Sequence, residues 1–487
     1  MIRPYFPARH QHDGTTGAEP YEDRMTLRSN SAAARDIAFH FHSYTNAKKN
    51  EAEGSLVLAS GKGIYVYDEN GKAYLEGLSG LWCLSLGYGE ERLIEAANRQ
   101  MRKLPYYHTF TQKVADVTVD LAEKLIAIAP VPMSKVFFCN SGSEANDSVV
   151  KMVWFYNNAL GRPEKKKIIG RHGGYHGVTV AAASLTGLPL NHKDFDLPIA
   201  NILHTDNPQY YRFGKPGESE EQFATRMAES LEAMIQKEGP ETVAAFIAEP
   251  VMGAGGVIIP PATYFEKIQA VLKKHDILFI ADEVICGFGR TGNMFGTQTY
   301  KLQPDIITLA KALSSAYLPI AAVMINRRVY DAISEHTGRL GSFAHGFTYS
   351  GHPVSAAVAL ETLKIYEERD IVGQVRAQAP VFAKGIQHFK DHPLVGETRS
   401  VGLIGAVELV RNRQTREIFD PKLGVPAYCV KQAQEHGLII RAIVNSIAFC
   451  PPLISTGEEI AEMYRRFGLA LDETLAWVKE QGLASAA

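Results

Sequence analysis

The sequence predicts an α/β protein built on one large, mostly parallel seven-stranded β-sheet, with a smaller α+β domain after it. Two observations predict the sheet. Seven short apolar segments recur between residues 135 and 326, and helix-length amphipathic segments separate most of them. A third observation predicts the smaller domain, because the pattern changes after about residue 350 to long helices and shorter strands.

The region before the sheet is irregular. We expect residues 1–30 to be a mobile tail, and residues 31–60 carry only a weak helical pattern. Residues 63–77 alternate apolar and polar side chains around Asn70-Gly71, which is typical of a β-hairpin. The expected domains are an N-terminal segment joining the small domain (31–76), a large domain (77–345) and a C-terminal small domain (346–487).

The seven apolar segments are too short for helices and too apolar for half-exposed strands, so we predict strands buried on both faces. They are 135–140, 166–170, 200–204, 244–250, 277–283, 305–311 and 320–326. Helices are expected at about 91–103, 114–128, 223–239, 263–275 and 353–369. A further short strand is expected at 402–410 in the smaller domain.

Two of these strands each end in one charged residue, Asp282 and Lys311. Parallel strands present such residues at the carboxyl edge of the sheet, where ligands of α/β sheets bind. A structural ion pair between these two buried residues would give the same sequence pattern. However, a lysine in apolar surroundings has a lowered pKa and can form a Schiff base with an aldehyde, while an aspartate keeps a pyridine nitrogen protonated. Pyridoxal phosphate (PLP) requires this pair of groups.

Two glycine-containing turns follow other strands of the sheet. Ser141, Gly142 and Ser143 begin a helix, and the free amides there are suited to a phosphate group. An ordinary serine helix cap is the alternative. In RHGGYHG (171–177), Tyr175 and His176 lie between glycines, so an aromatic ring there can stack on a flat ligand, unless it is simply a buried turn tyrosine.

Other features exclude whole classes of function. The net charge is −2 with no basic block, so we expect no nucleic-acid partner. The five widely spaced cysteines indicate reduced thiols. With no long apolar run and no signal sequence, we expect a cytoplasmic protein that does not bind membranes. His40 and His42 suggest a metal pair, but we identified no third ligand at usable spacing and expect no metal site.

GFGRTG at 287–292 matches the dinucleotide fingerprint GxGxxG. In that fingerprint the glycines follow the strand directly and open a long helix. Here Asp282 and Glu283 intervene and no clear helical period follows, so we reject nucleotide binding.

Four motifs in order resemble the class III (omega) aminotransferases, which are PLP enzymes of fold type I. The motifs are NSGSEAN (140–146), ADEVICGFGRTG (281–292), LAKALSSAYLPI (309–320) and HGFTYSGHP (345–353). The resemblance extends from about residue 40 to about residue 470 and is closest to the pyruvate-using amine transaminases. It implies PLP as cofactor and the fold type I transferase architecture.

The resemblance also implies roles for individual residues. Lys311 would be the catalytic lysine, with Tyr175 and Val284 on opposite faces of the cofactor ring. Glu249 would lie near the cofactor, and Thr348 would reach the phosphate bound in the other subunit. Trp82, Tyr175 and Arg441 would line the substrate pocket, with Arg441 binding the keto-acid carboxylate. The alternatives are a core tryptophan, a structural glutamate, a turn threonine and an arginine in a surface or domain-interface ion pair.

We therefore expect a ping-pong transaminase that moves an amino group from a primary amine or omega-amino acid to pyruvate. The partners are the amine donor, the keto-acid acceptor and a second copy of the chain, in a homodimer or tetramer with shared active sites. Two alternatives stay open. One is another PLP reaction on the same residues, such as that of an aminomutase, decarboxylase or racemase, and the other is a non-catalytic PLP-fold binding protein. The presence of Lys311 argues against the second.

Overall fold

The computed structural model describes residues 30–483. The predicted mobile tail therefore lies, apart from Asn30, outside the described residues. The chain divides into two units, residues 1–59 with 68–71, and residues 60–67 with 72–487. The described part of the first unit holds helices α1 (Ala32–Phe39) and α2 (Ala47–Glu53). Ser31 and Asn46 cap them by accepting hydrogen bonds from backbone amides of the first turn.

The second unit contains the predicted seven-stranded sheet, in the order β4-β10-β9-β8-β7-β5-β6. All seven predicted strands are confirmed, as β4 (Lys135–Cys139), β5 (Lys167–Arg171), β6 (Ile202–Thr205), β7 (Val243–Ala248), β8 (Leu278–Asp282), β9 (Ile306–Leu309) and β10 (Ala321–Ile325). The pairs among β6, β5, β7, β8 and β9 are parallel. Strand β10 runs antiparallel to both of its neighbours, β9 and β4, so the sheet is mostly parallel.

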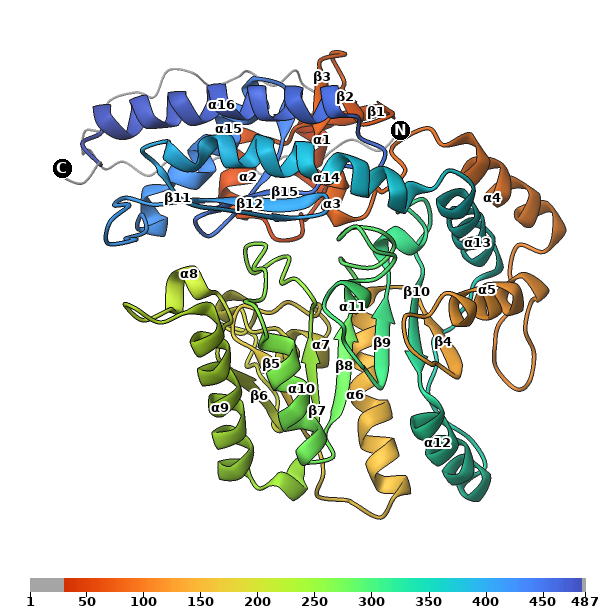
Figure 1. Cartoon of the computed structure of the whole chain (residues 1–487). Coiled ribbons are helices and arrows are strands. Elements are labelled where there is room, and N and C mark those ends of the chain that lie inside the picture. The colour runs from red at the N-terminus through yellow and green to blue at the C-terminus, as the bar shows by residue number, and fades with distance from the viewer. Residues whose placement is uncertain (1–29, 484–487) are drawn as a thin grey trace, which may run out of the picture. The chain divides into compact units, whose positions relative to one another are not determined.

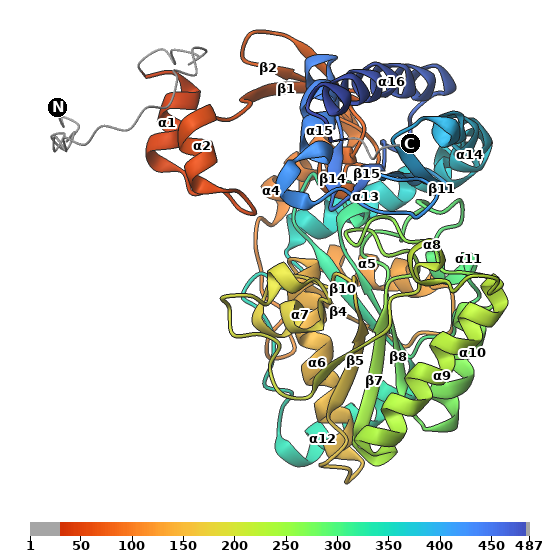
Figure 2. The same cartoon turned by 90° about the vertical axis from the view of Figure 1, so that its left-hand side faces the viewer.

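Helices cover both faces of this sheet, which explains why its central strands are apolar throughout. Figure 2 shows α9 and α10 on one face and α6, α7 and α12 on the other. Their bounds are α6 (Gly142–Ala159), α7 (Val180–Leu185), α9 (Glu220–Glu238), α10 (Tyr264–Lys274) and α12 (Arg327–Leu340). Every residue of β7, β8, β9 and β10 is buried between the two layers.

Two smaller sheets complete the fold. The first has the order β11-β12-β15-β14 and is antiparallel throughout. The second has the order β1-β2-β3-β13 and includes the predicted hairpin as the antiparallel pair β2–β3. Their strands are β1 (Leu58–Lys62), β2 (Tyr65–Asp68), β3 (Ala73–Glu76), β11 (Val395–Val401), β12 (Ile404–Leu409), β13 (Leu438–Ile439), β14 (Arg441–Ile443) and β15 (Ser446–Phe449).

Helices α14 (Ile371–Gln387), α15 (Val425–Glu435) and α16 (Gly457–Glu480) lie on one side of the β11–β15 sheet (Figure 1). A long helix, α13 (Pro353–Glu368), follows the large sheet in sequence and packs against α4 (Glu91–Lys103) and α5 (Asp116–Ala127). The predicted domain boundaries at 76/77 and 345/346 stay predictions.

The remaining elements are short. They are α3 (Ser79–Trp82), α8 (Tyr210–Phe213), α11 (Gly296–Thr299), and the 3-10 turns η1 (Pro189–Asn191), η2 (Pro240–Thr242), η3 (Lys311–Leu313), η4 (His388–Asp391) and η5 (Pro421–Leu423). Within residues 30–483, no helix has both the length and the apolar character that a membrane crossing requires.

Candidate active site

The two charged strand ends that the sequence analysis singled out lie on neighbouring strands. Strands β8 and β9 are neighbours (Figure 1) and pair in parallel, with Asp282 in register with Thr308. Lys311 follows Thr308 by three residues, at the same carboxyl edge of the sheet. The predicted juxtaposition of these strand ends is therefore confirmed, and it sets the position of the candidate site.

Asp282 is the centre of a buried hydrogen-bond network. Its Oδ2 accepts from Nδ1 of His176 at 2.7 Å and from Nδ2 of Asn146 at 2.9 Å. Its Oδ1 accepts from the backbone amide of Val284 at 3.1 Å. Because two side chains orient one oxygen, the other oxygen keeps lone-pair capacity for a further donor, such as a protonated ring nitrogen.

Lys311 stands in surroundings that favour its neutral form. Burial lowers its pKa below the ordinary value, against the opposing influence of Cys83 and Asp282. Among the described residues, no hydrogen bond or ion pair to its Nζ is present. A lysine amine that is desolvated and uncommitted is suited to form a covalent bond with an aldehyde.

The turn between β4 and α6 carries the predicted phosphate site. Ser141 is the N-cap of α6, and its side chain accepts from the amide of Glu144, so the alternative capping role is present. A Cβ on Gly142 would lie 3.2 Å from both methyl carbons of Val284, which places this helix start beside the end of β8. The Oγ of Ser143 accepts from the amide of Val178 at 3.1 Å and so holds the neighbouring loop.

Glu249 supports the site from the strand beside β8. It directly follows β7, is 3% exposed, and accepts hydrogen bonds from the amides of Tyr175 at 2.9 Å and Gly253 at 3.0 Å. Burial raises its pKa, and the nearby Asp282 acts in the same direction. The carboxyl group therefore fixes the backbone of the loop that carries Tyr175 and His176.

Trp82 and Thr348 occupy contrasting environments. Trp82 is 2% exposed and packs in an apolar cluster with Leu78, Val257 and Ile285. Thr348 is exposed on the loop between α12 and α13, where its carbonyl accepts from the hydroxyl of Tyr106 at 2.7 Å. The substrate role of Trp82 and the cofactor role of Thr348 stay predictions.

Arg441 is the first residue of β14, is half-buried, and is in register with Ala448 of β15. Across the described residues, none of the ion pairs or side-chain hydrogen bonds involves its guanidinium. The surface or interface ion pair that the sequence analysis kept as an alternative is therefore not seen. By contrast, Arg399 on β11 is paired with Glu397 and Glu408.

The sequence analysis missed Asn146 as a site residue, although its NSGSEAN motif contains it. Asn146 is 1% exposed, and besides Asp282 its Nδ2 donates to the carbonyl of His176 at 2.7 Å. It lies one helical turn beyond Gly142 on α6. That position on the buried side of a helix whose start faces a strand end is the signal that could have identified it.

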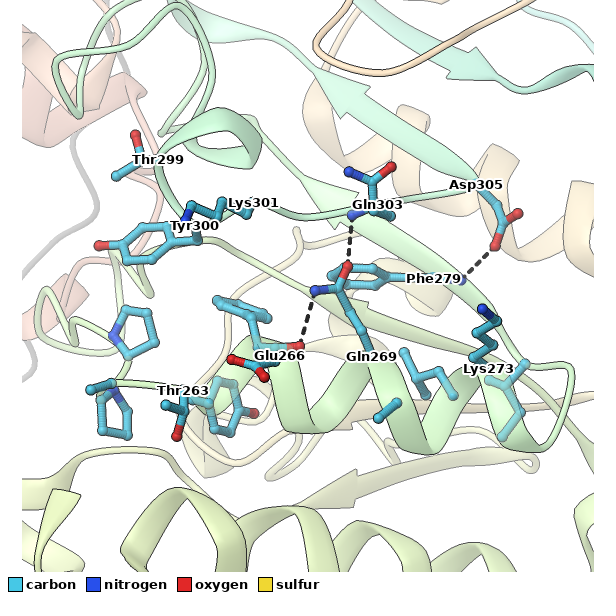
Figure 3. A pocket seen from close by; sticks show the side chains of 18 of the residues that line it. Thr263, Glu266, Gln269, Lys273, Phe279, Thr299, Tyr300, Lys301, Gln303 and Asp305 are labelled. Carbon is cyan, nitrogen blue, oxygen red and sulfur yellow. Dashed lines mark hydrogen bonds between the residues drawn. The ribbon is translucent and has the colours of Figure 1, made fainter. Parts of the chain in front are cut away.

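A cavity of about 850 Å³ lies at a different place in the second unit. It follows helix α10 and the amino end of β8 (Figure 3). Asp282, in contrast, is the last residue of β8, at the carboxyl end of that strand. Within the lining of the cavity, Gln269 accepts from the amide of Gln303 and Asp305 accepts from the amide of Phe279. None of the predicted site residues lines this cavity.

The residues at the sheet edge fit PLP. The oriented carboxylate of Asp282 suits a protonated pyridine nitrogen, the uncommitted amine of Lys311 suits an aldehyde, and the start of α6 beside Val284 suits a phosphate. Two buried atoms next to this network, Nε2 of His176 and Oδ1 of Asn146, also lack partners. The fold and the site together define a PLP-dependent enzyme of fold type I.

The comparisons with known proteins agree. The sequence matches the family described as Aminotransferase class-III over residues 46–471. The chain belongs to the class III aminotransferases, and its cofactor is PLP.

The similar proteins carry two kinds of name, gamma-aminobutyrate transaminase and omega transaminase. "Gamma aminobutyrate transaminase 3, chloroplastic" from Solanum lycopersicum is 54% identical over 426 residues, which cover 87% of this chain and 82% of that protein. "Probable gamma-aminobutyrate transaminase 4" from Oryza sativa subsp. japonica is 54% identical over 439 residues, which cover 90% of this chain and 91% of that protein. The omega transaminase from Pseudomonas jessenii, solved in complex with PMP, superposes with a TM-score of 0.91 at 56% identity and covers 92% of this chain and 99% of that one.

Proposed function

We propose that this class III transaminase uses pyruvate as amino acceptor and a primary amine or omega-amino acid as donor, in a ping-pong reaction. The observation that carries the proposal concerns the guanidinium of Arg441. No carboxylate among the described residues forms an ion pair with it. A guanidinium that is partly shielded from water and has no counter-charge is favourably placed to bind an anionic ligand. The carboxylate of a keto acid, bound through two parallel hydrogen bonds, meets that need.

The position of Arg441 supports this role. Ala448, its partner in register, is followed two residues later by Cys450. Cys450 is near enough to Lys311 for the two groups to influence each other's pKa. Strand β15 therefore leads from the neighbourhood of Arg441 towards the catalytic lysine.

The chain's own groups have separate tasks in the reaction. PLP supplies, when bound, an aldehyde that accepts the amino group and a ring that withdraws electrons. The amine of Lys311, whose pKa burial lowers, takes and returns the substrate proton. Asp282, oriented by His176 and Asn146, presents a negative charge to the ring nitrogen. The amides at the start of α6 bind the phosphate.

The names of the relatives bear on the donor. The plant relatives are named for gamma-aminobutyrate, whose amino group is terminal, and the structural neighbours are named omega transaminases. We infer that a terminal amine without a carboxylate on the same carbon is the donor class. An amino acid with its carboxylate at the far end belongs to this class as well.

We further propose that the enzyme acts as a homodimer in which Thr348 contributes to the partner's cofactor site. Thr348 is exposed, and aromatic side chains gather around its loop. Tyr106 is 36% exposed and Tyr349 60%, with their rings 5.8 Å apart in an edge-to-face contact. Exposed aromatic groups of this kind mark interaction surfaces.

A panel of donors and acceptors tests the substrate proposal. Purified enzyme is given an aryl amine, an alkyl amine, gamma-aminobutyrate or an α-amino acid with pyruvate, and alanine formation is followed. We expect alanine from the first three donors. A parallel series replaces pyruvate with 2-oxoglutarate. Activity with 2-oxoglutarate and none with pyruvate would overturn the acceptor, whereas activity restricted to α-amino acids would overturn the donor class.

A further inference from the structure

A compact group of ionisable side chains in the first unit has no part in the transaminase mechanism described above. It consists of Asp36, His40 and His42, with Ser55 beside them. Asp36 lies within α1, His40 is the C-cap of that helix, and His42 follows two residues later. The sequence analysis considered only the two histidines and did not weigh Asp36, which precedes His40 by four residues.

The two histidines converge on the carboxylate of Asp36. Nδ1 of His40 lies 2.9 Å from Oδ1 of Asp36, and Nε2 of His42 lies 2.7 Å from Oδ2. One ligand atom from each of the three residues falls within 4.8 Å of the other two. The two imidazole rings are 4.2 Å apart between centroids, at an angle of 45°. Three lone-pair donors of the kinds that bind transition metals thus surround one point.

The local backbone explains this convergence. Asp36 and His40 are one helical turn apart, so their side chains lie on the same face of α1. The amide of His40 still donates to the carbonyl of Asp36 at 2.9 Å, and His40 then adopts an extended conformation with φ −114° and ψ 127°. The helix therefore ends at Phe39, and the extended His40 turns the chain so that His42 faces the same carboxylate.

Ser55 adds a further oxygen to the group. Its Oγ lies 2.6 Å from Oδ2 of Asp36, 3.0 Å from Oδ1 of Asn50 and 3.4 Å from Nε2 of His42. A hydroxyl has one proton and can donate it to only one of these acceptors. The Ser55 hydroxyl therefore places one more polar oxygen beside the carboxylate of Asp36 and Nε2 of His42.

We propose that Asp36, His40 and His42 form a binding site for one divalent transition-metal ion of the zinc type. Imidazole nitrogens suit zinc, copper, cobalt and nickel better than calcium or magnesium. A tetrahedral zinc ion with bonds of about 2.0–2.1 Å separates its ligand atoms by roughly 3.3 Å. The observed contacts of 2.7 and 2.9 Å and the 4.8 Å limit lie on both sides of that value, so side-chain rotation is enough to accommodate the ion.

The site is open on one side. The side chain of His40 is 62% exposed, that of His42 27% and that of Asp36 17%. A cavity of about 270 Å³ adjoins it, lined among others by Ile37, His40 and His42. A fourth coordination position would therefore hold water. The ion would tie the end of α1 to the residues after it, so the expected role is to stabilise this segment.

Zinc titration of the full-length, untagged holoenzyme tests the site. Calorimetry with Zn²⁺ should show one equivalent bound per chain in the wild type. Asp36→Asn and His42→Gln should each weaken this binding by at least about tenfold, since even the loss of a supporting residue outside the ligand set costs about 10–100-fold. Co²⁺ in place of Zn²⁺ gives an independent optical readout, because a tetrahedral Co²⁺ site with nitrogen ligands absorbs visible light.

Two control variants separate this site from other zinc-binding groups. His388→Gln removes an exposed histidine on η4 and keeps every thiol and the PLP phosphate, so its binding should equal that of the wild type. Ser55→Ala keeps all three ligands and should still bind. Circular dichroism confirms that each variant is folded. Wild type that binds no zinc, or Asp36→Asn and His42→Gln variants that bind as tightly as His388→Gln, would overturn the proposal.

Discussion

At the scale of single residues, the role of Asp282 follows from the hydrogen bonds that each of its two carboxylate oxygens accepts. His176 and Asn146 both donate to Oδ2, while Oδ1 has only the amide of Val284. The carboxylate is thereby held in one orientation before any ligand binds. Preorganised groups of this kind lower the activation barrier because they need not rearrange during the reaction.

Asp282→Asn should lower the rate of the amine half-reaction by at least about 10²-fold, because the neutral amide no longer holds the ring nitrogen protonated. The rate is measured by rapid mixing of the PLP form with an amine. Asp276→Asn is a matched control, since Asp276 is 48% exposed and pairs with Arg162 and Arg328 at the surface. A rate close to that of the wild type in Asp282→Asn would refute the role of Asp282.

Arg441→Ala should raise the KM for pyruvate strongly and leave the half-reaction with an aryl or alkyl amine nearly unchanged. The reason is that only the keto acid presents a carboxylate to the guanidinium. The two half-reactions are measured separately. Arg465→Ala serves as the control, because Arg465 is 59% exposed and bound to Glu462. Equal losses in both half-reactions would identify Arg441 as a structural residue.

At the scale of elements, a buried group of charges joins helix α8 to the β11–β12 hairpin. Glu408 on β12 is paired with Arg399 on β11 and with Arg212 on α8. Its side chain is 6% exposed. Burial acts to raise the pKa of Glu408, but the two arginines outweigh it and hold the pKa below its ordinary value of 4.5.

Glu408→Gln should destabilise the protein at neutral pH by about 3–5 kcal/mol, the cost of breaking a buried pair, and so lower Tm by several degrees. A depressed folded-state pKa means that the pairing stabilises the fold above pH 4.5 and that this contribution is lost as the pH falls towards the folded-state pKa. The Tm difference between variant and wild type should therefore be full at pH 7 and shrink below pH 4.5. Calorimetric scans across this range measure it.

The exposed pair between Arg411 and Glu417 provides the comparison. Glu417 is 50% exposed, so Glu417→Gln should change stability by no more than about 1 kcal/mol at any of these pH values. A Tm difference for Glu408→Gln that is small at pH 7, or that grows as the pH falls, would contradict the assignment of Glu408 as a stabilising anion.

At the scale of the whole molecule, the proposed dimer makes each active site depend on two chains. Lys311→Ala and Thr348→Asp should each be inactive as purified proteins. Mixed under conditions of subunit exchange, they should form heterodimers in which one site carries both defects and the other carries neither. Recovered alanine formation measures the intact site, and mass spectrometry of differently labelled chains verifies the exchange. Absence of activity despite proven exchange would mean that each chain builds its own site.

The sequence by itself determined the seven strands, the turns between strand and helix, and the two charged strand ends. These features are local, because a strand buried on both faces must be apolar throughout and a helix start must supply a cap. It did not reveal that β10 runs antiparallel to its neighbours, since a buried strand has the same composition in either direction. Domain boundaries, oligomeric state and cellular location stay predictions. No local pattern of residues determines any of them.

Only the tertiary structure decided which groups have partners. Asn146 and Asp282 are 136 residues apart in sequence, and their hydrogen bond depends on the packing of α6 beside the end of β8. Arg441 reads in sequence like any surface arginine, and its lack of a carboxylate among the described residues appears only when the surrounding strands are in place. Even the nearby Asp36 and His42 meet only because α1 ends at Phe39 and His40 then adopts an extended conformation. Residue types and spacing define which chemistry is available, whereas burial and pairing, which are properties of the folded chain, select the groups that remain free to use it.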